Sequence, residues 1–204
     1  ANTVQAEDQE FWKESFRRWF VGMLACALQD EQVNHLVIIL YSEQGKGKST
    51  WIRRLLPPQW REYYRNGMVN PDNKDHQLLL STHLIINMEE FEGARIGDLA
   101  GLKRVITQES VTERKAYDMQ AYNFIRHASF IASTNNRQCL QDIGGNRRFL
   151  PSSIITLDYR TPVNYEGIYA QAYALIKEGY RYWYEGEEIN ELNRHNELHR
   201  MKDP

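Results

Sequence analysis

The feature that most constrains this fold is a glycine-rich turn that directly follows a short apolar run, His35–Tyr41. The turn consists of Gln44, Gly45, Lys46, Gly47, Lys48, Ser49 and Thr50. Helical spacing then continues to Leu56, after which two prolines stop it. A buried strand, a glycine-rich turn and a Lys-Ser pair opening a helix form the arrangement that holds the phosphates of a nucleoside triphosphate. The sequence therefore predicts a phosphate-binding loop for ATP or a related nucleotide.

Each residue type in this turn has a physical reason. Gly45 and Gly47 let the backbone curl, so that successive N–H groups point at the β-phosphate. The helix that follows adds unpaired N–H donors and a favourable dipole. Lys48 is placed to bridge the β- and γ-phosphates, and the Ser49 hydroxyl is placed to ligate Mg²⁺. Ser42 departs from the full pattern, which has glycine there, and the alternative reading is a glycine-rich surface turn.

Apolar runs of strand length alternate with segments of helical spacing along the chain. Predicted strands cover His35–Tyr41, Leu84–Met88, Ala128–Ser133 and Ser152–Leu157; predicted helices cover Glu7–Leu28, Ser49–Leu56, Ile96–Ile106 and Tyr165–Trp183. This alternation predicts an α/β fold with a mainly parallel sheet layered by helices. We expect an N-terminal helical segment (1–34) packed on a core (35–160), then a C-terminal helical segment (161–204). The polar stretch Arg65–Asp75 reads as a long loop.

Two carboxylates stand where the second predicted strand ends. Glu89 and Glu90 follow the apolar run Leu84–Met88 directly. Adjacent strand residues point to opposite faces, so the two side chains would take different tasks. We assign Glu89 to the metal shell and Glu90 to the attacking water. The alternative is the start of an acidic loop, because Glu92 continues the run.

Further polar candidates follow the third strand and precede the fourth. An amide at Asn135 can hydrogen-bond a γ-phosphate or a water at the carboxyl edge of a parallel sheet. Turn chemistry explains the same residue equally simply. Arg147 and Arg148 follow a glycine pair and suit a finger that neutralises charge on a transferring phosphate. Structural salt bridges are the alternative for both arginines.

Composition narrows the function classes. Hydrophobic residues make up 42% and charged residues 25% of the 204 residues, as in ordinary globular domains. The longest apolar run, Leu36–Tyr41, is too short to span a bilayer, so we expect no membrane association. Two distant cysteines favour a reduced, cytoplasmic setting. The net charge is −2, yet Gly101–Leu150 holds eight basic and four acidic residues, which makes it the candidate nucleic-acid contact.

Taken together, five motifs resemble the virulence-associated protein E domain, a P-loop ATPase of phages, plasmids and mobile elements. That family is similar to superfamily-three helicases and to the helicase part of primase–helicase proteins. The motifs are the strand with Gly45–Thr50, Leu84–Glu90, Leu102–Arg104 with Thr112–Tyr117, Ser133–Asn136, and Gly145–Pro151. The resemblance covers most of the chain, from about Phe11 to beyond Trp183, and implies a three-layer P-loop NTPase fold of the AAA+ or superfamily-three-helicase type.

The resemblance also implies roles for individual residues. Lys48 and Ser49 would form Walker A, Glu89 and Glu90 Walker B, and Asn135 the polar sensor. Arg147 or Arg148 would be the arginine finger, placed in a neighbour's site. The part that in the helicases faces single-stranded DNA corresponds to Lys103, Arg114 and Lys115. Glu89 departs from the family pattern, in which aspartate is usual, so metal geometry and turnover rate are open at that position.

We expect an ATP- and Mg²⁺-dependent motor domain of a phage-type or mobile-element DNA-replication protein. Its partners would be ATP and single-stranded DNA, and the full-length protein would form a hexamer-like homo-oligomeric ring. The chain would be a fragment of a longer protein. Two alternatives remain from other classes: a nucleotide-dependent switch or scaffold with little hydrolysis, and a P-loop kinase. Paired arginines after a sensor asparagine favour the motor, whereas a kinase needs an acceptor pocket and a lid.

Overall fold

The computed structural model describes residues 1–30, 32–70, 72–91, 96–113, 122–140 and 146–200. Its strands are β1 (Val4–Ala6), β2 (Val37–Tyr41), β3 (Tyr64–Asn66), β4 (Ile85–Met88), β5 (Ser110–Glu113), β6 (Tyr122–Ile125), β7 (Ser129–Thr134) and β8 (Phe149–Leu157). Its helices are α1 (Gln9–Leu28), α2 (Lys48–Arg53), α3 (Lys74–Thr82), α4 (Ile96–Thr107), α5 (Tyr165–Lys177) and α6 (Glu187–Glu197), with 3₁₀ turns η1 (Pro58–Tyr63) and η3 (Asn146–Arg148).

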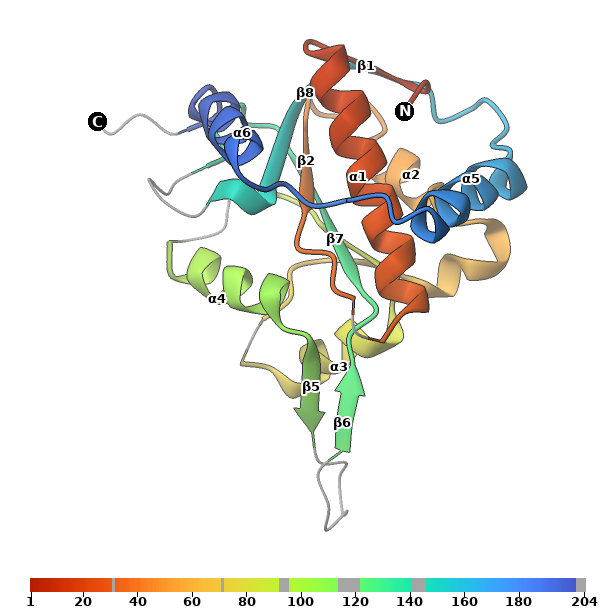
Figure 1. The fold of residues 1–204 in the computed structure, drawn as a ribbon. Helices are drawn as coiled ribbons and strands as arrows, with labels where there is room; N and C mark the ends of the chain where they lie inside the picture. Colours follow the sequence, from red (N-terminus) through yellow and green to blue (C-terminus); the bar gives the residue numbers. More distant parts are fainter. Residues whose placement is uncertain (31, 71, 92–95, 114–121, 141–145, 201–204) are drawn as a thin grey trace.

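A six-stranded sheet in the order β1-β8-β2-β7-β4-β3 forms the centre of the molecule (Figure 1). The strand β2, which precedes the glycine-rich turn, pairs in parallel with β7 on one side and β8 on the other. Among the described strands of this six-stranded sheet, β1 alone runs antiparallel to its neighbour. The predicted α/β class and mainly parallel sheet are therefore confirmed. The chain before Glu7, which falls in the predicted helical segment, instead supplies β1.

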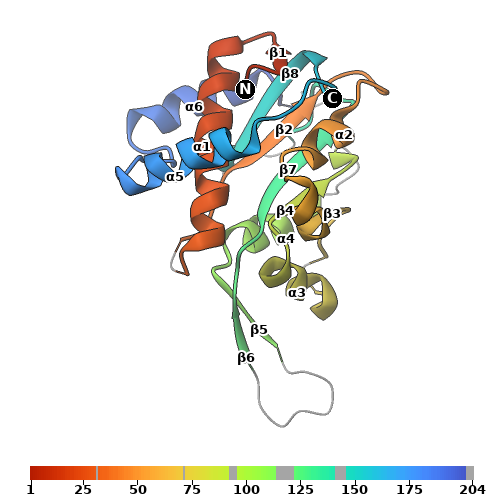
Figure 2. The same ribbon diagram turned by 90° about the vertical axis from the view of Figure 1, so that its right-hand side faces the viewer.

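Helices cover both faces of this sheet (Figure 2). Successive β2 side chains alternate between the faces, as strand geometry requires. Ile38 and Leu40 pack in one core cluster with residues of α1, α2 and α5. Val37 and Ile39 pack in a second cluster with residues of α3 and α4. All four side chains are completely buried, which explains why the run is apolar without alternation.

The long helix α1 is fixed to the sheet by tryptophans as well as by apolar packing. The Asp8 side chain accepts a hydrogen bond from the Phe11 N–H and so caps the first turn. Trp12 and Trp19 are fully buried. The indole N–H of Trp19 donates to the backbone carbonyl of Phe130 on β7, at 2.7 Å. This bond ties α1 to a strand that ends at the candidate site.

Element boundaries differ from expectation where polar segments form structure. The predicted loop Arg65–Asp75 contains most of β3 and the start of α3, whose cap is Asn73. The hairpin of β5 and β6 was not predicted, because its residues lack a clear apolar alternation. It extends from the lower end of the molecule in Figure 1.

Over the ranges that the structure describes, none of the helices combines the length and apolarity that a membrane crossing requires.

Candidate functional site

A cavity of about 310 Å³ opens where β2, β4 and β7 end. Parallel strands bring their carboxyl ends to one edge of a sheet, and ligand sites of open α/β sheets lie at that edge. The described residues that line the cavity are Gln44, Gly45, Lys46, Gly47, Lys48, Ser49, Thr50, Glu89, Ser133, Thr134 and Asn135. The structure thus brings together the whole predicted loop, one of the two predicted carboxylates and the predicted amide.

Both glycines of the loop adopt a backbone conformation that other residues rarely take. The φ angles of Gly45 and Gly47 are +82° and +83°. A Cβ atom on Gly47 would also lie 2.5 Å from the ring of Tyr159. Gly47 precedes α2 and provides no side-chain cap, so no capping side chain covers the first N–H groups of that helix. This part of the loop therefore presents backbone donors to the cavity.

The Lys48 ammonium group is surrounded by oxygen atoms. Its Nζ donates to the Ser42 carbonyl at 2.8 Å, the Ser42 hydroxyl at 3.1 Å and the Glu43 carbonyl at 3.1 Å. It also donates to Oδ1 of Asn135 at 2.8 Å. Ser42, the departure from the full glycine pattern, thus contributes a hydroxyl that holds the lysine. These contacts keep the ammonium group at the cavity that the loop lines.

The Ser49 hydroxyl donates to Oε1 of Glu89 across the same cavity. Asn87 lies behind this carboxylate, with its Nδ2 3.5 Å from Glu89 Oε1 and 3.0 Å from Asn66 Oδ1. A hydroxyl and a carboxylate side by side are hard oxygen ligands of the kind Mg²⁺ takes, together with water and phosphate oxygens. The two side chains therefore have the chemistry of Mg²⁺ ligands. The described residues contain no cluster of three or more metal-ligating His, Cys, Asp or Glu side chains.

Glu90 differs from its neighbour in both exposure and backbone conformation. It is exposed and does not belong to the described lining of the cavity. Its φ angle is +53°, the only positive value for a non-glycine residue among those described. Such a conformation is strained for glutamate, and strained residues concentrate at functional sites. Both glutamates follow the end of β4 at Met88, so strand alternation does not set their directions, and the two tasks assigned to them stay a prediction.

The two predicted finger arginines lie at the opposite end of the sheet from the cavity. Arg147 and Arg148 belong to η3, which leads into β8. Phe149 pairs with Val37, the first residue of β2, whereas the glycine-rich turn follows the last. The five residues of β2 therefore separate the arginines from the turn by roughly 16 Å. Burial and the nearby Arg147 both lower the pKa of Arg148. The structure does not bring the arginines to the cavity of their own chain.

The predicted DNA-facing residues lie away from the cavity or outside the described residues. Lys103 lies on α4 and is half-buried. Arg114 and Lys115 lie outside the described residues. On either side of them, β5 and β6 pair antiparallel, with Glu113 opposite Tyr122. Figure 2 shows this hairpin extending away from the sheet, below the start of β7.

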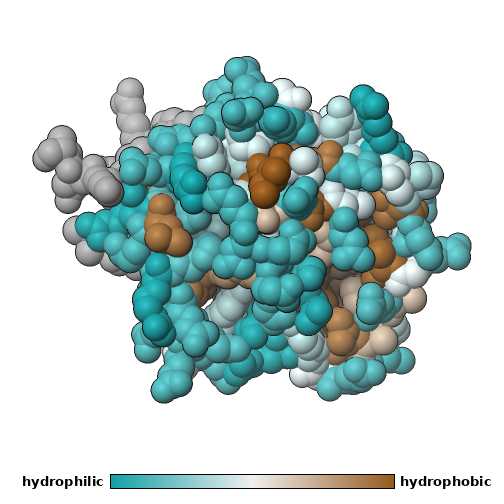
Figure 3. All heavy atoms as spheres, turned by 90° about the horizontal axis from the view of Figure 1, so that it is seen from above, coloured by the Kyte–Doolittle hydropathy of each residue, from teal (hydrophilic) through white to brown (hydrophobic). Residues whose placement is uncertain are grey.

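A second cavity, of about 520 Å³, was not foreseen from the sequence. It lies among α1, α2, α5 and the segment after β8, and its lining includes Phe16, Phe20 and Trp51 together with Lys13, Arg17 and Arg54. In Figure 3 the surface is mainly hydrophilic, and several hydrophobic groups lie on the right, the side of α5 in Figure 1. Helix α2 contributes to both cavities. Trp51 directly follows the loop in the sequence, but no pattern there indicates that it lines a cavity.

Fold and cavity together define an α/β protein whose glycine-rich loop opens at the carboxyl edge of a mainly parallel sheet. The family model of the virulence-associated protein E-like domain matches residues 1–201, and the chain belongs to this family. Among curated proteins, none matches the sequence.

The fold is similar to that of a solved structure. The apo structure of the NrS-1 C-terminal region (305–718) is 17% identical, with a TM-score of 0.51; the alignment covers 95% of this chain and 53% of that one. An A-form apo structure of the same region is 20% identical, with a TM-score of 0.49, and covers 97% and 52%. The chain thus spans about half the length of these structures.

Proposed function

We propose that the chain is an ATP-binding, Mg²⁺-dependent P-loop nucleoside triphosphatase, the motor domain of a phage-type or mobile-element replication protein. One observation carries the proposal: the Lys48 ammonium group and the Ser49–Glu89 hydrogen-bonded pair meet in one cavity at the carboxyl edge of the sheet. A cation, a hydroxyl and a carboxylate beside a loop of backbone donors match the charges of a Mg²⁺–triphosphate. Membership of the virulence-associated protein E-like family agrees with this reading.

Lys48 is ready to exchange protein oxygens for phosphate oxygens. Its present acceptors come from Ser42, Glu43 and Asn135. A β- or γ-phosphate oxygen carries more negative charge than a carbonyl or amide oxygen, so it competes well for the ammonium protons. Asn135, released from Lys48, would then face the γ-phosphate or a water molecule. Binding of a phosphate at the loop would therefore change the hydrogen bonding of the predicted sensor amide directly.

Ser49 and Glu89 would hold Mg²⁺, which when bound neutralises charge on the β- and γ-phosphates. In the proposed hydrolysis, a water oxygen bonds to the γ-phosphorus while the bond to the β–γ bridging oxygen breaks. ADP leaves with that electron pair, and Glu90 accepts the proton that the water loses. The positive φ of Glu90 supports this assignment, because strained backbone of this kind is concentrated at active sites.

The second cavity suits the nucleoside part of the same nucleotide. It shares α2 with the phosphate cavity: Ser49 and Thr50 line the one, and Trp51 and Arg54 line the other. Tyr159 contacts Gly47, while its neighbour Asp158 lines the second cavity. A nucleobase is flat and largely apolar, which matches an aromatic lining with polar groups at its rim.

A ring of subunits would complete the site. Arg147 and Arg148 lie about one strand length from the loop of their own chain, so a neighbouring subunit must supply them if they act on the nucleotide. A finger supplied in trans contributes roughly 10³–10⁵ in rate. Single-stranded DNA would be held by Lys103, Arg114 and Lys115. The support for this part is the basic excess of Gly101–Leu150 and the resemblance to superfamily-three helicases.

The central test compares a loop lysine with a lysine outside both cavities. Lys48→Ala should abolish ATP binding in calorimetry, because the loop loses the cation that its oxygens hold. Lys177→Ala is the control, since that lysine is exposed on α5 and lines neither cavity, so its removal should change affinity little. Equal affinities for the two variants and the parent would refute the proposal.

Steady-state ATPase with and without single-stranded DNA separates the proposed motor from its two rivals. A motor hydrolyses ATP and responds to DNA, a switch binds ATP with little turnover, and a kinase turns over only with an acceptor.

Mixing Lys48→Ala with Arg148→Ala chains tests the ring, because some interfaces would combine an intact loop with an intact arginine. Mixtures that assemble by light scattering and remain inactive would exclude a finger in trans.

A further inference from the structure

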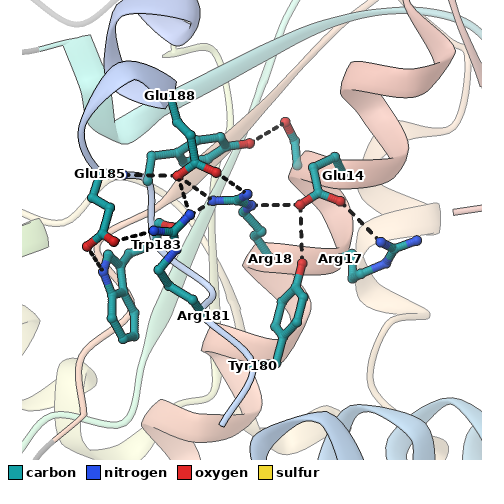
Figure 4. Close-up of polar contacts among 10 residues, drawn as sticks. Glu14, Arg17, Arg18, Tyr180, Arg181, Trp183, Glu185 and Glu188 are labelled. Carbon is teal, nitrogen blue, oxygen red and sulfur yellow. Dashed lines mark hydrogen bonds and ion pairs between the residues drawn. The ribbon is translucent and has the colours of Figure 1, made fainter. Parts of the chain in front are cut away.

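Helix α6 is held at its N-terminal end by an ionic network with α1. Glu188 accepts hydrogen bonds from Arg18 and Arg181, each at 2.7 Å (Figure 4). Arg18 also donates to Glu14 at 2.8 Å and to the Trp183 carbonyl at 2.7 Å. The Arg18 side chain is only 11% exposed, so solvent screens this network less than it screens a surface pair. The start of α6 therefore has a fixed position relative to the sheet.

The other half of α6 reaches the turn that carries the two arginines. The side-chain amide of Asn196 donates to the Asn146 carbonyl at 2.9 Å and to the Phe149 carbonyl at 3.1 Å. These two residues bracket Arg147 and Arg148 in the sequence. Asn196 is 3% exposed, so water does not compete freely for its donors. One carboxamide thus holds the turn on both sides of the arginine pair.

His195 on α6 and His199, just after the helix ends, both bond to neighbouring backbone. His195 donates from Nε2 to the Pro151 carbonyl at 2.9 Å, and its ring stacks on Phe11 with centroids 3.6 Å apart. His199 donates from Nδ1 to the Arg137 carbonyl at 3.2 Å. Burial lowers the pKa of His199, which keeps the ring neutral at pH 7. These contacts fix the backbone near η3, the turn that carries Arg147 and Arg148.

We propose that Asn196 is a positioning residue, which sets where η3 presents Arg147 and Arg148 to a neighbouring subunit. This inference rests on the proposed function, in which the arginines complete a neighbour's phosphate site. The turn has only three residues, so it has few hydrogen bonds of its own. The Asn196 amide donates to a half-buried carbonyl at one end of it and to a buried carbonyl at the other. Because a misplacement of about 1 Å can reduce a rate 10²-fold, such anchoring matters for a finger.

The experiment compares two asparagines of one helix in the full chain. Asn196→Ala removes both hydrogen bonds, whereas Asn193→Ala changes an exposed asparagine on the same helix. In hydrogen exchange, the amides of Arg147 to Phe149 should exchange roughly tenfold faster in Asn196→Ala only. ATP affinity should match the parent, while kcat falls about 10- to 100-fold. Asn196→Gln, which keeps an amide donor, should recover part of the rate.

A double variant separates positioning from a general loss of structure. In a chain that already carries Arg147→Ala and Arg148→Ala, adding Asn196→Ala should lower turnover no further. If Asn196→Ala does not fold, Asn196→Leu replaces it, because leucine keeps a branched side chain there and loses the donors without placing a charge against the two carbonyls. Unchanged exchange at η3, or an unchanged kcat, would overturn the inference. If the parent chain binds ATP without turnover, the proposed hydrolysis is refuted. In that case, hydrogen exchange at η3 is the measurement that tests whether Asn196 anchors the turn.

Discussion

Arg126 is a fully buried cation whose hydrogen-bond acceptors among the described residues are backbone carbonyls. Its guanidinium donates to Ala128 at 2.8 Å, Val105 at 3.0 Å and Asn34 at 3.0 Å. It also donates to the carbonyls of Ile106 and Gln108. Burial lowers the pKa of Arg126 to about 10, so the side chain remains charged at pH 7. One side chain thus joins the end of α4, the segment before β2 and the chain between β6 and β7.

Arg126→Met keeps the length of the side chain and removes every donor. An unsatisfied buried carbonyl destabilises by about 1–3 kcal/mol, so the carbonyls of Ala128, Val105 and Asn34 together amount to roughly 3–9 kcal/mol. Relief from keeping a charge buried offsets several kcal/mol of this loss. We therefore expect a net destabilisation of about 3–5 kcal/mol, which corresponds to a fall in Tm of about 6–20 °C for a chain of this size.

Urea unfolding and thermal scans of Arg126→Met measure this loss directly. Arg104→Met is the matched control, since Arg104 lies on α4, the helix whose end Arg126 contacts, and pairs with Asp72 at an exposed site. An exposed pair contributes only about 0–1 kcal/mol. Arg126→Lys should fall between the parent and Arg126→Met, because an ammonium group reaches fewer of the carbonyls. A loss for Arg126→Met no larger than that of the control would refute the role assigned to the buried guanidinium.

Two further predictions concern the loop and the ionic network. Gly47→Ala should abolish ATP binding in calorimetry, because alanine is strained at φ +83° and its Cβ would lie 2.5 Å from the Tyr159 ring. The hydrogen bond from Arg18 lowers the pKa of Glu188. The contribution of this ion pair to stability is therefore complete above pH 4.5, the ordinary pKa of glutamate, and it is lost as pH falls through the lower pKa of the folded state. Glu188→Gln should flatten that acid loss in urea unfolding measured across the range, and an unchanged pH profile would contradict the linkage.

Local patterns in the sequence predicted the loop and the strands around it. Four apolar runs gave strands that match β2, β4, β7 and β8 to within a few residues. The strand, the turn and the start of the helix are consecutive in the chain. A local pattern was therefore enough to predict that Lys48 and Ser49 open the helix after the turn. The mainly parallel sheet followed from the alternation of strands and helices. The P-loop chemistry of these residues stays a prediction.

The features that were missed depend on contacts between distant parts of the chain. Tyr159 contacts Gly47 from the segment after β8, a pairing that no spacing rule indicates. Ser42 read as a defect in a glycine pattern, yet its hydroxyl holds Lys48. Arg126 read as one more basic residue of a basic stretch, although it is buried. Sequence patterns report periodicity, whereas burial of a polar side chain is decided by partners that fold in from elsewhere.

The two ends of the parallel sheet have different tasks in this chain. At the carboxyl end, Lys48, Ser49 and Glu89 present side chains to a cavity. At the amino end, Arg126 and Asn196 both bind backbone carbonyls, and so fix the path of the chain while the Arg147 side chain remains exposed. Because β2 separates the two ends, neither can serve the other within one chain. An arrangement of subunits that places the amino end of one sheet against the carboxyl end of the next would join them, and this is the geometry that a closed ring repeats.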